Sequence, residues 1–360
     1  MLYREAGQFK STYAADQAIF PLRQDRIGLF AILGLAFIAV PLLADDFILD
    51  AIAIPFLILA LATIGLNILT GYAGQLSLGT GGFMGAGAYA CYKLTTSFPE
   101  ANIILLILLS GVFSAAIGIV FGLPSLRIKG LYLAVTTLAA QFFLEWCFIR
   151  IGWLYNYNVS GAIDSPERNT IGGLVLTGPN ASSVTRYIVV LAIVALITLL
   201  AKNLVRGRIG RSWMMIRDMD IAAELMGVRP LIAKLSAFAV SSYICGVAGA
   251  MFVFFYLGSV EPAAFSITLS FQILFMVIVG GLGSLIGCYF GAAFIWILPI
   301  FLRNGLPMIG IDIGAENVVH LTSMIVGVLI ILFLIWEPHG LARLWQIGKE
   351  KLRVWPFPYA

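Results

Sequence analysis

The side chains that could bind a polar substrate are gathered in and around one glycine-rich run. The run packs seven glycines into 17 residues, namely Gly71, Gly74, Gly79, Gly81, Gly82, Gly85 and Gly87. Amide and hydroxyl side chains lie between and just before these glycines: Asn67, Thr70, Gln75, Ser77 and Thr80. Such side chains donate or accept hydrogen bonds without carrying a charge, so each needs a partner that could be a polar solute.

Two interpretations of this run stay open. Gly81-x-x-x-Gly85 has the spacing of a close helix–helix contact, which needs no ligand. Alternatively, the run is a broken or re-entrant helix whose freed backbone groups line a cavity. The later tetrad Gly280–Gly283, followed by Ser284, offers a similar break. On the second interpretation, the candidate substrate-pathway residues are Asn67, Thr70, Gln75, Ser77, Thr80 and Ser284.

Glu145 is the clearest acidic residue inside an apolar stretch. A carboxylate at membrane depth would suggest a functional role. However, Glu145 lies beside Trp146 near the end of its stretch, where both side chains could sit at the membrane–water interface. Gln141 and Gln272 are weaker candidates for lining a pathway.

Residue patterns typical of an enzyme are missing from the sequence. His320 and His339 have no partner at metal-ligand spacing. The four cysteines lie in or at the ends of apolar stretches without paired spacing, as small buried hydrophobic residues do. Gly348-Lys349 lacks the upstream glycine of a Walker A phosphate loop and is followed by Glu350. We therefore expect no catalytic residue, no metal and no cofactor on this chain.

Composition places the chain in a membrane. Of its 360 residues 61% are hydrophobic and only 11% are charged, with a mean hydropathy of +0.99. A soluble globular protein carries about 25% charged residues, so this chain could not cover a surface facing water. The net charge of +4 indicates no nucleic acid partner, because the cations lie in short loops. We expect an all-α integral membrane protein, a polytopic bundle with lipid as its main solvent.

The apolar stretches predict about ten transmembrane helices, since one helix needs roughly 20 mostly apolar residues. An N-terminal segment, 1–26, precedes the membrane region 27–336, and a short basic tail, 337–360, follows it. The predicted spans are Ile27–Ala44, Ala51–Thr70, Gly71–Leu94, Asn102–Leu123, Leu131–Ile149, Tyr187–Val205, Leu235–Gly258, Phe271–Gly280, Ser284–Leu302 and Leu321–Trp336.

The distribution of cations orients these spans. With ten spans and the N-terminus inside, 17 of the 22 Lys and Arg residues fall on the cytoplasmic side. The opposite orientation would reverse that ratio, against the positive-inside rule. We therefore expect both termini and the loop 202–234 to be cytoplasmic, and the polar loop 150–186 to lie outside.

A short helix is expected within the loop 202–234. Asp218 or Asp220 could cap its start, and Gly227 could take the left-handed position after its last turn. Pro230 prevents simple continuation. Ile221, Leu225 and Val228 fall on one face, so the helix would present an apolar stripe to a partner. The alternative is a solvated loop whose cations only fix orientation.

Five spans on either side of the loop 150–186 would suggest inverted-topology repeats, a device of transporters. The third span of each half is the one interrupted by glycine. However, the topology places both glycine clusters on the cytoplasmic side, whereas inversion should place them on opposite sides. Whether the halves are true repeats stays open.

Several motifs resemble the LivM-type permease of branched-chain amino acid ABC importers. The resemblance runs in order from about residue 55 to 341, and its first two motifs are specific. The motifs are GLNILTGYAGQLSLG at 65–79, DMDIAAELMG at 218–227, KLSAF at 234–238, VGGLGS at 279–284 and EPHGL at 337–341.

This resemblance implies a subunit of the bacterial inner (cytoplasmic) membrane. Its implied partners are a second homologous permease, two ATP-binding subunits that bind and hydrolyse ATP, and a periplasmic substrate-binding protein. Translocation would proceed by ATP-driven alternating access, with leucine, isoleucine or valine as substrate. The short cytoplasmic helix would then be the coupling helix, with the contact residues Asp218, Asp220, Ile221, Ala222, Ala223, Glu224, Leu225 and Gly227.

Two departures from the family pattern leave the substrate open. Thr80 stands where the family often has histidine, and Asn158–Ser165 replaces a Thr-Gly-Gly-type stretch. Urea and short amides are alternative substrates in related systems. A secondary transporter driven by an ion gradient is a further alternative, although such proteins usually need ionisable groups inside the membrane, and Glu145 is the one candidate.

Overall fold

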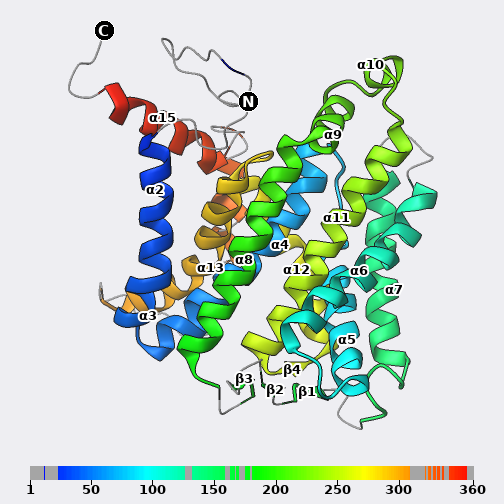
Figure 1. The fold of residues 1–360 in the computed structure, drawn as a ribbon, viewed down its shortest axis with the longest axis vertical. Helices are drawn as coiled ribbons and strands as arrows, with labels where there is room; N and C mark the ends of the chain where they lie inside the picture. Colours follow the sequence, from blue (N-terminus) through cyan, green and yellow to red (C-terminus); the bar gives the residue numbers. More distant parts are fainter. Residues whose placement is uncertain are drawn as a thin grey trace. The chain divides into compact units, whose positions relative to one another are not determined.

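The computed structural model of the chain is mainly helical (Figure 1). It describes residues 12, 23–125, 132–158, 163–166, 168–169, 175–178, 181–308 and 340–354, together with scattered positions between 321 and 335. The chain divides into two compact units, Met1–Asp45 and Asp46–Ala360. The prediction of an all-α polytopic membrane protein is confirmed.

The first unit contains one apolar helix with a local change of winding. α2 (Arg23–Gly34) continues through the π-helix η1 (Leu35–Ala39) into α3 (Val40–Leu43). Ala44 is extended and ends it. The apolar part, Ile27–Leu43, is slightly shorter than the usual length of a membrane span.

Two long buried helices form the centre of the second unit. The first joins η2 (Ile48–Ala53), α4 (Ile54–Asn67) and η3 (Ile68–Tyr72), and the second joins α11 (Pro230–Met251) to η4 (Phe252–Leu257). They pack closely, because a Cβ atom at Gly65 would lie 2.8 Å from the Cys245 sulfur. Apolar side chains all round each helix fit burial in the interior of a bundle.

Helices α5 (Thr80–Ser97), α6 (Ile103–Ser125), α12 (Ile267–Gly280) and α13 (Leu285–Met308) surround this central pair. Small residues make the closest approaches. A Cβ atom at Gly87 of α5 would lie 2.2 Å from the Gly246 carbonyl oxygen of α11, and one at Gly291 would lie 1.9 Å from the Met276 carbonyl oxygen. Such contacts let helix backbones meet where lipid offers no hydrophobic drive for association. α7 (Tyr132–Arg150) and α8 (Ser183–Arg206) complete the bundle.

The order of elements repeats with inverted direction. In each half a long buried helix ends in a π-helix, and a segment without α-helix leads to a second helix and then a third. α4, α5 and α6 correspond in this way to α11, α12 and α13, and the two central helices run antiparallel (Figure 1). The counterpart of the glycine-rich segment 73–79 is therefore 258–266, not the tetrad at 280–283. With this pairing the two corresponding segments lie at opposite ends of the unit, as inverted repeats require (Figure 1). The difficulty that both glycine clusters fall on one side of the membrane therefore no longer applies.

The two ends of this unit differ in structure (Figure 1). At one, here called the strand end, β1 (Ile163–Asp164) pairs with β4 (Ser259–Val260), and β2 (Arg168–Asn169) pairs with β3 (Val175–Thr177). The turn η5 (Pro262–Phe265) follows β4. At the other, here called the α10 end, lie α9 (Arg208–Asp218) and α10 (Asp220–Leu225). α15 (Gly340–Val354) contacts α12 and α13 near this end, with Trp345 against Phe290.

Among the described residues, seven helices are long and apolar enough to span a membrane, where the sequence predicted ten. The first predicted span is the shorter apolar helix of the first unit. The third is α5, which is helical only from Thr80 and whose glycines and polar residues lower its hydropathy. The described positions of the tenth, scattered between 321 and 335, are helical, but they form no continuous described stretch that could be counted as a span. The helices α9 and α15 were not predicted, since their sequences mix charged and apolar residues.

Candidate functional site

The glycine-rich run is a break between two helices. The central helix ends at Tyr72, residues 73–79 are non-helical, and α5 begins at Thr80. The structure thus shows the predicted helix break at residues 73–79, and close helix packing at the glycines inside α5. That the freed backbone groups of the break line a cavity stays a prediction.

Side chains from other helices bind the backbone at the start of α5. The Leu78 amide donates to the Thr137 hydroxyl at 3.0 Å, and the Gly81 amide donates to the Ser270 hydroxyl at 2.8 Å. The Gly82 amide donates to the side-chain oxygen of Gln141. The first amides of a helix have no partner within it, so inside a membrane they need such acceptors. Gln141 also donates to the Phe265 carbonyl at 2.7 Å, which ties α7 to η5.

Asn67 joins the other end of the break to the turn between α12 and α13. Its amide nitrogen donates to the Ser284 carbonyl at 2.9 Å, and its oxygen accepts from the Gly283 amide at 2.9 Å. The Ser284 hydroxyl accepts from the Gly287 amide at the start of α13. Of the candidate pathway residues, the structure thus brings Asn67 and Ser284 together. Their polar groups serve this junction.

Arg217 connects the α10 end to the same break. Its Nη1 donates to the Gly71 carbonyl oxygen at 2.8 Å, while Nε and Nη2 both lie 2.9 Å from Asp218 Oδ1. Gly74 has φ +68°, and a Cβ atom there would lie 2.7 Å from the Arg217 Cγ. Glycine at 74 therefore provides both the left-handed backbone and the space that the arginine occupies.

Three other candidate residues have unused hydrogen-bonding capacity. The buried side-chain polar atoms of Thr70, Gln75 and Thr80 have no hydrogen-bond partner among the residues that the structure describes. Ser77 is also buried, and its hydroxyl accepts only a long bond, 3.5 Å, from the Gly79 amide. A buried polar group without a partner costs about 1–3 kcal/mol. Thr70, Gln75 and Thr80 are therefore the candidates that a polar ligand could satisfy.

The short helix α10 presents apolar side chains to its surroundings. Ile221 is 65% exposed and Leu225 is 86% exposed, whereas Ala223 is fully buried. Met219 and Met226, at the two ends of the helix, are also exposed, and Val228 is half-buried. These side chains form an exposed apolar surface at the α10 end.

The predicted ends of α10 are partly correct. Gly227 has φ +86°, the left-handed conformation expected of it, and Pro230 begins α11. Neither predicted aspartate is the N-cap. Met219 holds that position without a side-chain hydrogen bond, Asp218 ends α9, and Asp220 is the first residue of α10. The capping prediction was wrong because α9 continues to the residue before Met219, which leaves no loop for a capping side chain.

Sequence reasoning missed three residues at these junctions. Arg217 was one cation among seven in its loop, and Thr137 and Ser270 are hydroxyl residues in apolar helices. Nothing in a single sequence pairs Arg217 with a distant backbone carbonyl, or Thr137 and Ser270 with backbone amides more than 50 residues away. Glu145 is half-buried in α7 beside the exposed Trp146, and its place at the membrane interface stays a prediction.

Comparison with known proteins identifies the family. The family model described as the permease component of the branched-chain amino acid transport system matches residues 48–334. The chain belongs to this permease family. The matched range covers the whole central pair of helices, both breaks and α10.

Curated relatives of this permease carry names of the same kind. The high-affinity branched-chain amino acid transport system permease protein LivM of Salmonella typhimurium is 30% identical over 88% of the chain and 75% of its own length. The protein of the same name from Escherichia coli is 28% identical over the same shares. A probable LivM from Methanocaldococcus jannaschii is 27% identical over 70% of the chain and 72% of its own length. No solved structure matches this permease.

Proposed function

We propose that this permease is the membrane subunit of an ABC importer that translocates branched-chain amino acids by ATP-driven alternating access. The observation that carries the proposal is the joining of an exposed apolar helix to a break in the central helix. α10 offers a contact for a partner, and Arg217, at the end of the preceding helix, hydrogen-bonds Gly71 at the break. The names of the relatives supply the class of substrate.

The sequence has no ATP-binding motif of its own, and this supports separate ATP-binding subunits as partners. The chain has no Walker A loop, so ATP would be bound and hydrolysed by two separate ATP-binding subunits. We infer that α10 docks in those subunits through Ile221 and Leu225. The remaining members of the complex would be a second, homologous permease and a periplasmic binding protein that delivers the amino acid. The chain itself would be neither an enzyme nor a holder of a cofactor.

The charge distribution supports an orientation in the inner membrane. Seven Lys and Arg residues lie at the α10 end, near the end of α8, on α9 and around the start of α11: Lys202, Arg206, Arg208, Arg211, Arg217, Arg229 and Lys234. By the positive-inside rule this end, with both termini of the chain, would be cytoplasmic. The strand end would then face the periplasm.

The proposed mechanism runs from α10 to the break. Closure of the ATPases on ATP would move α10 and α9 together, and Arg217 would transfer the displacement to the Gly71 carbonyl. Because Asn67 binds the turn 283–284, the two halves would respond as one. The unsatisfied groups of Thr70, Gln75 and Thr80 would meet the polar part of the substrate as the pathway changes the side to which it opens.

Reconstitution tests the proposal. Proteoliposomes that contain both permeases and both ATP-binding subunits are expected to transport radiolabelled L-leucine from its binding protein. This transport should occur only when ATP is present on the side of the membrane that carries the ATP-binding subunits. Vesicles without the ATP-binding subunits should show no uptake, and a proton ionophore should leave ATP-driven uptake unchanged. Uptake by the permeases alone along an ion gradient would instead establish a secondary transporter.

A further inference from the structure

The strand end contains a cavity that none of the candidate pathway residues lines. Its volume is about 560 Å³, within the range of small-molecule sites. The lining residues are Asp164, Ser165, Gly178, Arg186 and the run from Phe254 to Ser259. They come from three separate parts of the chain, namely the polar stretch after α7, the first turn of α8 and the end of the second central helix, α11–η4. The cavity thus lies at the opposite end from α10.

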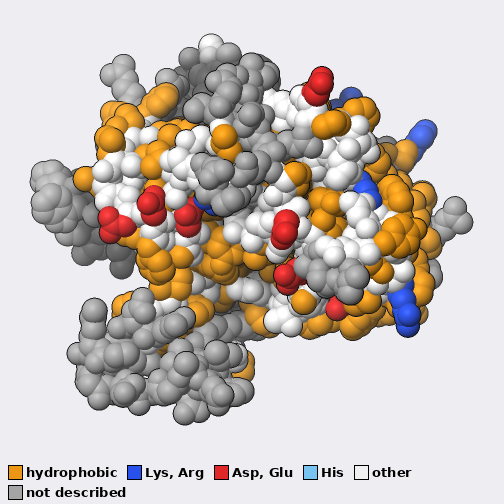
Figure 2. Space-filling model, turned by 90° about the horizontal axis from the view of Figure 1, so that it is seen from below, with side chains coloured by type: hydrophobic (Ala, Val, Ile, Leu, Met, Phe, Trp, Pro, Cys, Tyr) orange, Lys and Arg blue, Asp and Glu red, His pale blue; other side chains and the backbone are white. Residues whose placement is uncertain are grey.

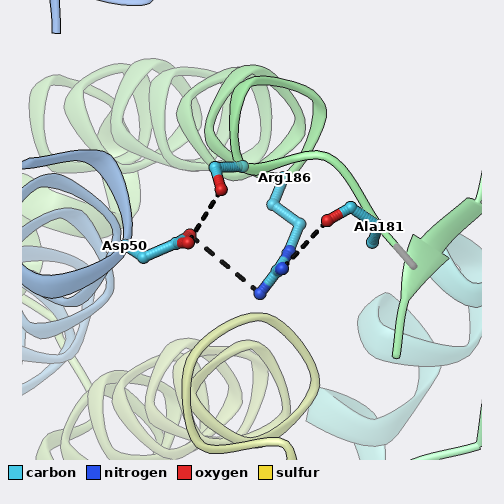
Figure 3. Close-up of polar contacts among 4 residues, drawn as sticks. Asp50, Ala181 and Arg186 are labelled. Atoms are coloured by element: carbon cyan, nitrogen blue, oxygen red, sulfur yellow. Dashed lines mark hydrogen bonds and ion pairs between the residues drawn. The ribbon is translucent and has the colours of Figure 1, made fainter. Parts of the chain in front are cut away.

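Arg186 places a fixed positive charge in this cavity. Its Nη2 donates to the Ala181 carbonyl oxygen at 2.9 Å, and its Nη1 lies 4.0 Å from Asp50 Oδ1 (Figure 3). The Ser183 hydroxyl holds the same aspartate from the other side, with a 2.8 Å bond to Oδ2. The side chain of Arg186 is only 21% exposed, so these two contacts fix the guanidinium in place.

Part of that guanidinium remains available. Arginine has five N–H donors, of which Nη2 uses one on the Ala181 carbonyl and Nη1 uses none on Asp50, at 4.0 Å. The Nε is buried without a hydrogen-bond partner among the described residues, so the remaining Nη donors are those that a ligand in the cavity could reach. Asp50 Oδ1 likewise accepts no hydrogen bond within that part of the chain, and its separation from Nη1 is too long for one. A guanidinium held in this way is prepared to bind a carboxylate through two parallel hydrogen bonds.

Negatively charged and electron-rich groups line the rest of the cavity, opposite in sign to Arg186. Asp164 of β1 is exposed, and the Ser165 amide donates to the Gly258 carbonyl oxygen at 2.8 Å, which fixes β1 against the end of η4. The residues from Phe254 to Leu257 form the carboxyl end of a 28-residue helix. The last carbonyl groups of a helix have no amide partner within it and carry the negative end of its dipole. This wall suits an ammonium group.

Apolar surface is present as well. Leu257 is 38% exposed and Tyr256 is half-buried, so both offer side-chain surface, whereas Phe254 and Phe255 are almost fully buried. Figure 2 views the strand end, where Asp and Glu side chains are spread among hydrophobic ones. A cation, an anionic wall and an aliphatic surface together match the three parts of an aliphatic α-amino acid.

We infer that this cavity is a binding subsite for the zwitterion of an aliphatic amino acid, with the carboxylate on Arg186 and the ammonium group on Asp164 and the helix carbonyls. The inference rests on the proposed function and adds a second position on the pathway at which the substrate binds. The substrate would be held at the strand end, by both of its charges, before it reaches the uncharged groups near the break. An inorganic anion has no group that would pair with Asp164, and urea, being uncharged, would form no ion pair with either residue.

Equilibrium binding tests the subsite directly. The purified complex of permeases and ATP-binding subunits, without the binding protein, is titrated with radiolabelled L-leucine. The competitors are 4-methylpentanoate, which lacks the ammonium group, and 3-methylbutylamine, which lacks the carboxylate. Leucine is expected to bind, and each competitor should bind at least about tenfold more weakly, since one ionic contact is worth on the order of 1.4 kcal/mol or more.

Variants of the two charged residues test which group of the ligand each one binds. Arg186→Gln should weaken leucine and 4-methylpentanoate but not 3-methylbutylamine, and Arg186→Lys should recover part of the loss. Asp164→Asn, at an exposed position where folding is not at risk, should weaken leucine and 3-methylbutylamine. Lys93→Gln, which removes a cation outside the cavity lining, serves as the control and should bind leucine like the wild type.

The outcomes separate this inference from the proposed function. If wild-type vesicles import leucine with ATP but the complex binds none without the binding protein, the subsite is refuted and the importer stands. Equal leucine affinity in Asp164→Asn, Arg186→Gln and the wild type would refute it as well. If wild-type vesicles do not import leucine with ATP, the proposed function fails and the subsite fails with it.

Discussion

Arg217 of α9 donates a 2.8 Å hydrogen bond to the carbonyl oxygen of Gly71, in the last turn of the first central helix. This bond spans 146 residues of sequence and joins a charged helix at the α10 end to the break before α5. Because the π-helix at 68–72 ends at this point, the Gly71 carbonyl is free to accept a side-chain donor. A movement of α9 must therefore either move the break or lose the bond.

Replacing Arg217 with Gln should uncouple the α10 end from the break. We expect leucine-stimulated ATP hydrolysis and leucine uptake to fall about tenfold, since a hydrogen bond from a charged donor is worth about 1.5–3 kcal/mol. Arg211→Gln, which removes an exposed cation from the same helix, is the control for charge. Both activities, measured in one vesicle preparation, should be unchanged in Arg211→Gln. Similar values for the two variants would argue against a special role for Arg217.

Gly227→Val should disturb α10 through the backbone alone. The residue has φ +86°, and no atom lies within 4 Å of the position of an added Cβ, so steric contact is not the cause. A β-branched residue in the left-handed region costs about 1–2 kcal/mol, whereas Asn tolerates it. We expect Gly227→Val to lower stimulated ATP hydrolysis several-fold with normal membrane insertion, and Gly227→Asn to retain it. Equal loss in both variants would show that the left-handed conformation is not what matters.

Gln141→Leu should destabilise the fold without touching the substrate. It leaves the Gly82 amide at the start of α5 without an acceptor and breaks the link to the Phe265 carbonyl. The expected loss in the free energy of unfolding is about 1–3 kcal/mol for the buried donor. Thermal unfolding in detergent measures it, with the partly exposed Gln272→Leu as the control. An unchanged midpoint for Gln141→Leu would contradict the anchoring role.

Gln75→Leu separates a substrate contact from a structural one. The amide of Gln75 makes no hydrogen bond to the described residues, so its loss should leave thermal stability equal or higher. Leucine uptake should nevertheless fall several-fold, because the amide is proposed to meet the polar part of the substrate. Uptake at the wild-type rate, with the stability unchanged, would remove Gln75 from the proposed pathway.

The sequence anticipated features that depend on local chemistry. Apolar runs located most of the membrane helices because lipid requires them. The residues between Asp218 and Pro230 indicated a short helix ended by Gly227, because only a few residues accept the left-handed conformation. The helix break near Gly74 was part of one of two open interpretations, and the structure shows it at residues 73–79.

Features that depend on distant partners could not be predicted. α5 begins at Thr80 because Ser270 and Gln141 supply acceptors for its first amides, and neither residue is near it in sequence. Arg217 looked like an orientation signal because its partner is a backbone carbonyl, which has no sequence signature. The Asp50–Arg186 pair could not be predicted either, because its members lie in two helical segments that are far apart in the sequence.

The most direct test of the account is photo-crosslinking from α10. The benzophenone amino acid p-benzoylphenylalanine would replace Leu225, which is 86% exposed, and in a control Leu200, an exposed residue of α8. Under illumination of the complete transporter, position 225 should yield an adduct of the permease with an ATP-binding subunit, and position 200 should not. The absence of that adduct from a complex that still imports leucine would contradict the proposed role of α10.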